Sequence, residues 1–299
     1  MFTRIAESGS FSKAADAMDV PRATATKLVQ ELEREVGVRL LQRTTRRVSL
    51  SPEGAAYYER ASRLISELDD MNESAAGAGA SPRGRLRVDI GSLLANSLLI
   101  PALGDFQARY PHLRLDLGVS DRLIDLIGEG VDCVIRGGDM PDSSLVARRL
   151  ADLQWVTCAA PAYVRRHGLP RHPSDLMTPA ADGGHVAVGY FSSLTGRHAP
   201  MEFERHGERY TVPTGKSVAV NESTAHMTSL VAGLGVGQTF RFMAEPHLSD
   251  GSLVELLPEW HRPLHRLSLV HPGARLPNSR IRAFSDWVAT VFAQVDAAR

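Results

Sequence analysis

The sequence predicts an α/β protein with an N-terminal winged helix-turn-helix, a dimerising linker helix and a two-lobed α/β domain. Three helical patterns and a basic hairpin fill residues 1–50, and an apolar heptad repeat follows in residues 51–76. After a hinge at residues 77–85, strand patterns alternate with helical patterns in residues 86–299. This alternation starts again after about residue 150, which indicates two lobes.

Length and composition are those of a globular protein with two or three domains. The chain has 299 residues, of which 43% are hydrophobic and 23% are charged. No apolar stretch approaches the ~18 residues that a transmembrane helix needs. The start, MFTRIAESGSFS, lacks the basic region and apolar block of a signal peptide. We therefore expect a cytoplasmic protein with no membrane partner.

The two cysteines, Cys133 and Cys158, lie in the apolar runs VDCVI and WVTCAA. Lone cysteines in such runs are usually small buried packing residues. Neither has a partner at the spacing of a redox or metal motif. We expect no metal and no cofactor.

The second and third helical patterns, joined by a short turn at residues 19–21, predict a helix-turn-helix. Ser10 or Ser12 can cap the second helix. Pro21 suits the first position of the third helix, and Gly37 suits its end. The core face of that third helix is expected to hold Ala25, Leu28, Val29 and Leu32.

The outer face of the third helix carries small, polar and basic side chains. These residues are Arg22, Ala23, Thr24, Thr26, Lys27 and Gln30. In a helix-turn-helix such a helix enters the major groove of double-stranded DNA and meets base edges. Taken alone, the pattern favours a merely solvated helix face, because most polar helix faces are solvated.

The segment after this helix favours DNA binding. Residues 38–43 and 48–50 bracket a polar tip, which predicts a β-hairpin wing. Between Val36 and Ser51 the chain carries only basic charges, although 34 basic and 34 acidic residues cancel over the whole protein. A local patch of this kind can hold phosphates or enter the minor groove. The expected contacts on the wing are Arg43, Thr44, Arg46 and Arg47.

A long helix is expected next, with Ser51 as its cap, Pro52 at its first position and Glu53 in its first turn. Its apolar residues recur at intervals of four and three, as in a coiled-coil seam. The seam consists of Tyr57, Ala61, Leu64, Leu68 and Met71. It predicts a homodimer through this helix. The alternative is a helix that packs on its own domain.

The rest of the chain is predicted to form the two lobes. Lobe 1 is expected at about 86–160 and 267–299, and lobe 2 at about 161–266. Expected strands are 86–90, 113–118, 133–136, 155–159, 186–190, 218–220 and 267–270, with a hairpin at 201–212. Expected helices are 98–110, 122–129, 162–167, 224–232 and one that starts at 278. This order predicts parallel sheets with helices on both faces.

Ligands of such sheets bind at the carboxyl ends of the strands, and two lobes would place them in a cleft. The candidate residues at strand ends are Ser92, Leu93, Ser120, Gly138, Tyr190, Phe191 and Asn221. The hydroxyls of Ser92 and Ser120 beside helix starts would favour an anion. The alternatives are ordinary helix caps for the polar residues and core packing for the aromatics.

The motifs ESGSFSKAADAM and TKLVQELEREVGVRLLQRTTRRVSLSPEG resemble the DNA-binding domain of LysR-type transcriptional regulators. The segments RLRVDIG, FQARYPHLRLDL, IGEGVDCVIRGG, AGLGVG and DGSLVELLPEW resemble the effector domain of that family. The resemblance implies a periplasmic-binding-protein-like effector domain, a small-molecule effector, a homodimer or homotetramer, and RNA polymerase as a further partner. It also implies regulation of promoter DNA. One departure is Arg22, where the family often has glutamine, and arginine prefers guanine.

Two other classes of protein remain as alternatives. One is a DNA-architectural protein without a ligand, for which a two-lobed domain has no use. The other is an enzyme with an appended DNA-binding domain. The glycines at 233–237 follow a helical pattern and so fit a helix end rather than a dinucleotide loop. The chain has no HExxH or GxSxG motif, and we do not expect an enzyme.

Overall fold

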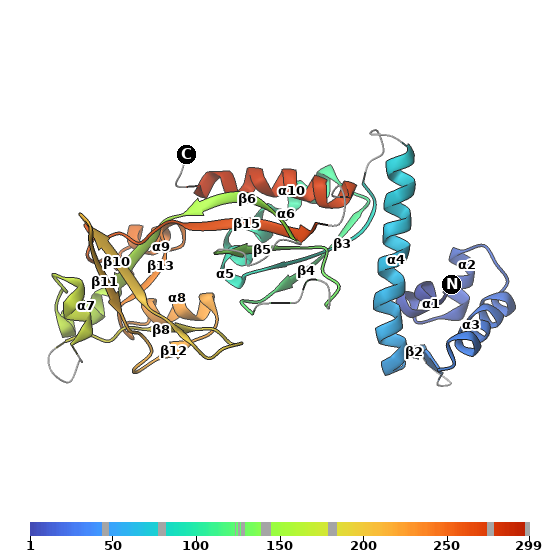
Figure 1. Cartoon of the computed structure of the whole chain (residues 1–299), viewed down its shortest axis with the longest axis horizontal. Coiled ribbons are helices and arrows are strands. Elements are labelled where there is room, and N and C mark those ends of the chain that lie inside the picture. The colour runs from blue at the N-terminus through green and yellow to red at the C-terminus, as the bar shows by residue number, and fades with distance from the viewer. Residues whose placement is uncertain are drawn as a thin grey trace. The chain divides into compact units, whose positions relative to one another are not determined.

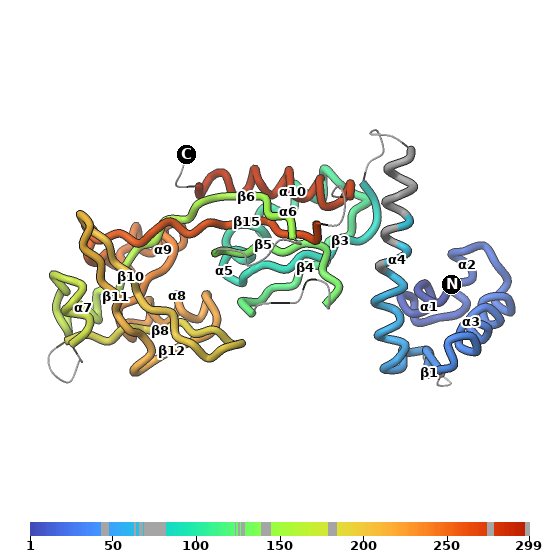
Figure 2. The backbone as a smooth tube through the Cα atoms, viewed as in Figure 1, coloured from blue at the N-terminus to red at the C-terminus, as the bar shows by residue number. Residues whose placement is uncertain are grey.

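The computed structural model divides into two compact units, residues 1–80 and 81–299 (Figure 1). Figure 2 follows the backbone through both of them. The structure describes residues 1–43, 48–76, 82–122, 124, 126, 129–138, 145–178, 184–273 and 278–296. The first unit is the predicted winged helix-turn-helix with the long helix, and the second holds the α/β lobes.

Three short helices, a hairpin and a long helix make up the N-terminal unit. Their bounds are α1 Phe2–Ser8, α2 Phe11–Ala17, α3 Arg22–Val36, β1 Leu41–Arg43, β2 Val48–Leu50 and α4 Pro52–Ala76. Ser10 caps α2 by accepting a hydrogen bond from the Lys13 N–H at 3.3 Å, and Gly37 ends α3 with a left-handed φ of 78°. Both were predicted.

Two details of α3 differ from the prediction. Pro21 stands one residue before the helix, with an extended backbone, rather than at its first position. Leu28 is not a core residue, because 44% of its surface is exposed. The buried face is narrower than the apolar pattern suggests, since only Ala25 and Val29 of this helix are fully buried.

The wing is tied to α3 by a carboxylate. Oε1 of Glu33 accepts the N–H groups of Leu40 and Leu41, at 2.8 and 2.9 Å. Both leucines are buried in the core of the unit. The hydrogen bonds therefore fix the start of the hairpin against the helix end, where the sequence alone predicted only two separate elements.

The long helix α4 starts against the same core. Ser51 Oγ accepts the Gly54 N–H at 2.8 Å, as a cap does, and donates to the Arg39 carbonyl at 2.6 Å. A Cβ at Gly54 would lie 1.8 Å from the Leu40 carbonyl oxygen. Only glycine lets the helix approach the hairpin this closely.

Lobe 1 of the second unit is a five-stranded sheet in the order β4-β3-β5-β15-β6. Its strands are β3 Gly84–Ile90, β4 Leu113–Val119, β5 Cys133–Gly137, β6 Leu145–Leu153 and β15 His265–Pro272. Its helices are α5 Ser92–Leu94, the π-helix η1 Ala95–Leu99, α6 Ile100–Arg109, α10 Ser279–Phe292 and the 3-10 helix η4 Ala293–Val295. Strand β3 is parallel to β4 and β5, whereas β15 is antiparallel to β5 and β6. The prediction of a purely parallel sheet is wrong.

Lobe 2 has smaller sheets, β13-β7-β14, β12-β8-β9 and the hairpin β10-β11. Its strands are β7 Trp155–Ala159, β8 Gly189–Phe191, β9 His198–Ala199, β10 Met201–Arg205, β11 Glu208–Val212, β12 Ala219–Val220, β13 Gly237–Phe240 and β14 Val254–Glu255. Its helices are α7 Pro161–His167, η2 Pro173–Met177, α8 Ser223–Val231 and α9 Arg241–Ser249. Only β12 and β8 pair in parallel among these strands, and the predicted hairpin at 201–212 is confirmed.

The boundary between the lobes lies earlier than predicted. Strand β7 was assigned to lobe 1, but it pairs with β13 and β14 of lobe 2. Lobe 1 is therefore 82–153 and 265–296 within the described chain, and lobe 2 is 155–264. The sequence pattern misses β6, β9, α9, β13 and β14. It also places a helix at 122–129, where residues 123, 125, 127 and 128 lie outside the described residues and Arg122, Ile124, Leu126 and Glu129 are not helical.

Both cysteines are buried packing residues of strands, as predicted. Burial raises the pKa of the Cys158 thiol to about 12 and also raises that of Cys133. Neither thiol forms a thiolate near neutral pH.

Candidate functional site

The outer face of α3 offers side chains to a partner. Arg22, Ala23, Thr24, Lys27 and Gln30 are exposed. Thr26 is half-buried, and its hydroxyl donates to the Arg22 carbonyl at 3.1 Å. The Lys27 ammonium lies 3.8 Å from Glu31, a pair that is weak because both side chains are solvated. Ser12 is half-buried on α2. The predicted base-contacting residues of α3 are therefore accessible to a partner, and their contact with DNA stays a prediction.

The wing forms by antiparallel pairing of β1 and β2, with Arg43 opposite Val48. The predicted contacts Thr44, Arg46 and Arg47 lie outside the described residues, as does the side chain of Arg43. The hairpin itself is thus confirmed, and the basic tip stays a prediction.

The apolar seam of α4 is largely uncovered. Leu64 is 66% exposed and Leu68 is 53% exposed. Ala61 is half-buried, and the side chain of Met71 is outside the described part of the helix. Tyr57 differs from the other seam residues, because its ring packs edge-on against Phe2 of α1 at 5.6 Å. Tyr57 therefore packs on its own domain, which corrects its assignment to the dimer seam.

In the second unit, two of the predicted ligand residues come together where lobe 1 meets lobe 2. Ser92 is the first residue of α5 in lobe 1, and Tyr190 lies on β8 in lobe 2. Asp121, which follows β4, joins them. Its Oδ1 accepts the Ser92 N–H at 2.8 Å and the Ser92 hydroxyl at 3.1 Å, and its Oδ2 accepts the Tyr190 hydroxyl at 3.4 Å.

The start of α8 completes this contact from lobe 2. The Ser223 N–H donates to Asp121 Oδ2 at 2.5 Å, and the Ser223 and Ser92 hydroxyl oxygens lie 3.1 Å apart. Glu222 accepts a hydrogen bond from the Ser92 hydroxyl across the lobes. Glu222 also caps α8, because its carboxylate accepts the Thr224 and Ala225 N–H groups. We call Ser92, Asp121, Tyr190, Glu222 and Ser223 the interlobe network.

Burial and hydrogen bonding set the protonation of this network. Burial alone would raise the pKa of Glu222, but the hydrogen bonds from Ser92, Thr224 and Ala225 outweigh it and lower that pKa. Burial raises the pKa of the Tyr190 hydroxyl, and the charge of Asp121 raises it further. Glu222 is therefore an anion at neutral pH, and Tyr190 stays a hydrogen-bond donor.

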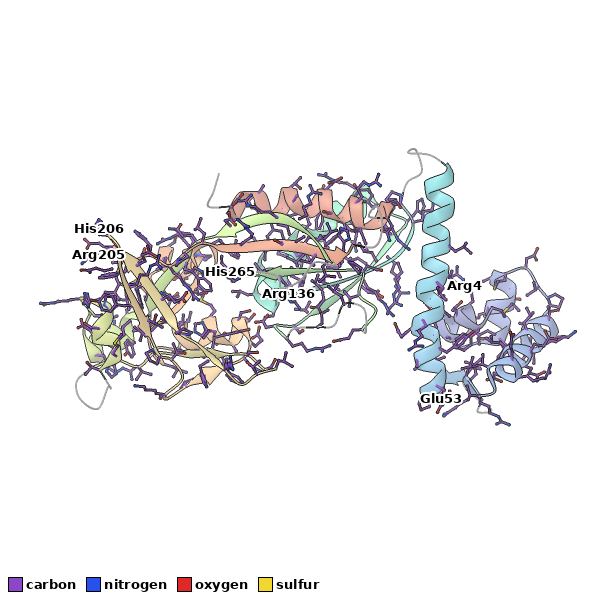
Figure 3. All side chains as sticks on the ribbon, in the orientation of Figure 1. Arg4, Glu53, Arg136, Arg205, His206 and His265 are labelled. Carbon is purple, nitrogen blue, oxygen red and sulfur yellow. The ribbon has the colours of Figure 1, made fainter. Side chains whose placement is uncertain are left out.

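A buried ion pair contacts the backbone on both sides of Asp121. Arg136 of β5 pairs with Asp89 of β3 (Figure 3 labels Arg136). The same guanidinium donates to the carbonyl oxygens of Ser120 and Arg122, at 3.2 and 3.3 Å. These two residues flank Asp121 in the chain. The pair thus fixes the backbone that carries the Asp121 carboxylate.

The structure does not place the other predicted ligand residues in the network. Leu93 is buried next to Ser92. Ser120 has a buried hydroxyl without a partner among the described atoms. Gly138 follows β5 with a φ of 96°, and its N–H donates to the Arg266 carbonyl. Phe191 contacts the His198 ring at 5.7 Å, and Asn221 is exposed.

Sequence reasoning missed Asp121, Glu222 and Ser223. Each lies within two residues of a residue that was named, Ser120 or Asn221. The available signal was the acidic residue at both strand ends, since carboxylates can cap a helix start as serine and asparagine do.

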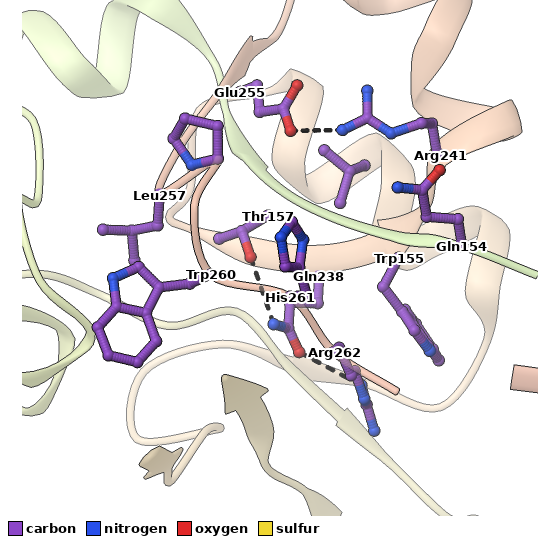
Figure 4. Close-up of a pocket in the computed structure, with 12 residues that line it drawn as sticks. Gln154, Trp155, Thr157, Gln238, Arg241, Glu255, Leu257, Trp260, His261 and Arg262 are labelled. Atoms are coloured by element: carbon purple, nitrogen blue, oxygen red, sulfur yellow. Dashed lines mark hydrogen bonds and ion pairs between the residues drawn. The ribbon is translucent and has the colours of Figure 1, made fainter. Parts of the chain in front are cut away.

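A small cavity lies in lobe 2, with a volume of about 40 Å³ (Figure 4). Its polar walls already pair with one another. Gln238 donates to the Thr157 hydroxyl at 3.3 Å and accepts from Arg262 at 3.4 Å, and Arg241 pairs with Glu255. A volume of this size holds about one or two water molecules and no metabolite.

The part of the chain that the structure describes contains neither a metal-binding cluster nor a membrane-spanning helix. No group of three or more histidine, cysteine, aspartate or glutamate side chains is arranged to hold a metal ion there. Within the same residues, none of the helices combines the length and apolar character of a membrane span.

The predicted motif at residues 233–237 is a helix end, as expected. Gly233 follows α8 with a φ of 72°, and its N–H donates to the Leu230 carbonyl at 3.0 Å. A Cβ at Gly235 would lie 2.5 Å from the Val186 carbonyl oxygen, and Gly237 begins β13. The glycines allow a tight turn and close packing, and no nucleotide loop is formed.

Comparison with known proteins agrees with this architecture. Residues 1–55 match the bacterial regulatory helix-turn-helix protein, lysR family, and residues 79–293 match the LysR substrate binding domain. An HTH-type transcriptional repressor of Pseudomonas aeruginosa is 36% identical, over 98% of this chain and 90% of its own length. The HTH-type transcriptional regulator YhjC of Escherichia coli is 38% identical, over 97% of this chain and 95% of its own length.

Solved structures of full-length regulators are similar as well. CrgA, a LysR-type transcriptional regulator from Neisseria meningitidis, has 30% identity and a TM-score of 0.62, and the match covers 97% of this chain and 96% of that one. The Vibrio cholerae virulence activator AphB has 26% identity and a TM-score of 0.59, over 97% and 96% of the two chains. With its helix-turn-helix and its substrate-binding domain, this chain belongs to the LysR family of transcriptional regulators.

Proposed function

We propose that this regulator binds promoter DNA as a dimer and that a small molecule, bound where the two lobes meet, changes that binding. The observation that carries the proposal is the interlobe network, in which five polar side chains from two lobes converge. A contact of this kind can be made or broken by a ligand, and a ligand that binds one arrangement better shifts the population toward it.

For DNA, the exposed face of α3 supplies the base contacts. Arg22, Lys27 and Gln30 can reach base edges in the major groove, with Ala23, Thr24 and Thr26 beside them. The wing residues Arg43, Thr44, Arg46 and Arg47 are proposed to neutralise phosphates or to enter the minor groove. Ser10 and Ser12, at the start of α2, are proposed to lie near the sugar-phosphate backbone of the DNA.

For the dimer, α4 supplies the seam through Ala61, Leu64, Leu68 and Met71. Leucines that are more than half exposed at heptad spacing are stabilised when a second helix covers them. We propose that two dimers assemble into a homotetramer, with RNA polymerase as a further partner on the promoter. A protein that works on the chromosome is expected in the cytoplasm.

The same features favour a regulator over the two alternatives. A purely architectural DNA-binding protein has no use for two lobes joined by a polar contact. An enzyme needs a reactive group in a pocket, and the sequence carries no HExxH or GxSxG motif that would supply one. We propose a protein without catalytic activity and without a cofactor.

A footprint on the DNA upstream of the gene tests the proposal. The full-length protein is expected to protect a site with two-fold symmetry, and a panel of small metabolites is screened for one that changes the footprint. The same panel is run with Tyr190→Phe, which removes the hydroxyl that contacts Asp121. The melting temperature of the protein is measured with the same panel. If no metabolite changes either the footprint or the melting temperature, the sensing role is wrong.

A further inference from the structure

The chain's own carboxylates occupy the donor groups of the interlobe network. Asp121 of lobe 1 accepts the Ser223 N–H of lobe 2 at 2.5 Å and the Ser92 N–H of lobe 1 at 2.8 Å. Both N–H groups stand at the start of a helix, where a free backbone donor would otherwise meet solvent or a ligand. Glu222 of lobe 2 accepts the Ser92 hydroxyl.

A ligand that used these donors would therefore compete with Asp121 and Glu222. The Ser92 hydroxyl has one hydrogen to donate, while Asp121, Glu222 and the Ser223 hydroxyl oxygen all lie within hydrogen-bond distance of it. The Ser92 hydroxyl therefore has more acceptors around it than it has hydrogens to donate. The interactions that join the lobes and those that would hold a ligand use the same atoms.

Arg136 also holds the backbone on both sides of Asp121 in place. The Arg136 guanidinium is only 13% exposed, donates to the carbonyls on both sides of Asp121, and pairs with Asp89, which is 10% exposed. Gly118 of β4 leaves room for this pair, since a Cβ there would lie 2.5 Å from Asp89 Oδ2. A buried ion pair by itself adds little stability, so its specific effect here is positional.

We propose that Asp121 is an internal latch, which holds lobe 2 against lobe 1 when no effector is bound, and that Arg136 is its positioning residue. The inference rests on the proposed function of this same site and adds how the site is regulated. An effector must displace the Asp121 carboxylate from the Ser223 N–H. The latch lowers the apparent affinity for the effector by the fraction of molecules in which it is open.

Hydrogen exchange of the full-length protein without any added small molecule tests the latch. The exchange is resolved to single amides by mass spectrometry with gentle fragmentation. The Ser223 amide has Asp121 as its acceptor, whereas the Thr224 and Ala225 amides have Glu222. In Asp121→Asn we expect the Ser223 amide to exchange about ten- to a hundredfold faster, because a hydrogen bond to a charged group is lost. The two neighbouring amides serve as internal controls and keep their rates.

Two further variants separate the latch from local damage. Ser92→Ala keeps Asp121 but removes the hydroxyl that contacts lobe 2, so the Ser223 amide should exchange faster while the amide of residue 92 stays protected. Arg136→Lys keeps the positive charge but cannot reach both carbonyls, and we expect an intermediate rate at Ser223. The control Arg148→Lys, at a pair with Asp286 on the other side of lobe 1, should leave that rate unchanged.

Equal exchange at Ser223 in the wild type and in Asp121→Asn would overturn the latch. An Arg136→Lys rate equal to that of the wild type would overturn the positioning role. Neither result would touch the proposed function, which the footprint and the metabolite panel test. If the Ser223 amide exchanges slowly in the wild type and faster in Asp121→Asn, but no metabolite changes the footprint, the latch stands and the proposed sensing role fails.

Discussion

The backbone N–H of Ser223 donates to the carboxylate of Asp121 at 2.5 Å, and this hydrogen bond runs from lobe 2 to lobe 1. The two residues are 102 positions apart in the chain. The bond joins the start of α8 to the loop after β4, and Ser92 lies on the same carboxylate. Any molecule that separates the lobes at this point has to break it.

Replacement of Ser92 by alanine should weaken the response to an effector more than it changes the affinity for DNA without effector. The variant removes one hydroxyl that contacts three partners in the network. Coupling between two sites is typically ~1–3 kcal/mol, so loss of part of it is measurable as a shift in the effector concentration. Promoter binding is titrated with and without the active metabolite. Equal loss of basal and effector-dependent binding would count against the sensing role.

Leu68→Asp, or Leu64→Asp, should convert the dimer into monomers or aggregates. Either change places a charge in the apolar seam of α4, and burying an unpaired charge is costly. Sedimentation velocity measures the mass. The matched control is Leu194→Asp, because Leu194 is 70% exposed and lies in lobe 2, outside the helix. An intact dimer in both seam variants would show that another surface holds the protomers together.

Lys27→Ala should reduce affinity for the specific site by roughly 1–3 kcal/mol and affect random DNA much less. Lys27 is exposed on the outer face of α3, and its ion pair with Glu31 is too weak to hold it. Binding to the footprinted site and to a scrambled duplex is compared. Lys216→Ala, an exposed lysine in lobe 2, is the control for loss of one positive charge.

Arg46→Ala should instead weaken binding to both duplexes by similar factors. The wing is expected to contact phosphates, so the slope of log affinity against log salt should fall by about 1 for each lost contact. Binding is measured over a salt series. If the variant loses specificity while its salt slope stays at the wild-type value, the wing reads bases.

Gly54→Ala should destabilise the N-terminal unit by about 1–3 kcal/mol or more, because the new methyl group would overlap the Leu40 carbonyl at 1.8 Å. The control is Gly104→Ala in α6, where nothing lies within 4 Å of the added Cβ. That change is expected to be neutral or to stabilise by about 0.5–1 kcal/mol. Denaturant unfolding compares the two. Similar stabilities would mean that α4 can move away from the hairpin.

Acidification should destabilise the second unit through His226 on α8. Burial lowers the pKa of His226 below its ordinary value of 6.5, so the unfolded chain takes up the proton first. The free energy of unfolding therefore falls as the pH drops from 7 to about 5.5, by at most about 1.4 kcal/mol per pH unit for this proton. His226→Gln should give a flatter pH dependence than the wild type. His261→Gln, at an exposed position, should keep the wild-type slope.

Local patterns in the sequence were sufficient for the elements whose signals are local. The predicted caps Ser10 and Ser51 accept the expected N–H groups, because capping depends on neighbours within three residues. Strand β6, by contrast, has the sequence LVARRLADL with two adjacent arginines, so it lacks the alternation of apolar and polar residues that predicts a strand. It is an edge strand, and its pairing with β15 decides its structure.

Periodicity alone also could not say which partner an apolar face meets. Tyr57, Leu64 and Leu68 share one heptad seam, yet Tyr57 packs on Phe2 while the two leucines are exposed. The amino-acid sequence determined the helix-turn-helix, the long helix and the two α/β lobes, since hydrophobic spacing and caps act over a few residues. Only the tertiary structure decided that Asp121 meets Ser223, because a contact between residues far apart in the chain depends on how the two lobes come together.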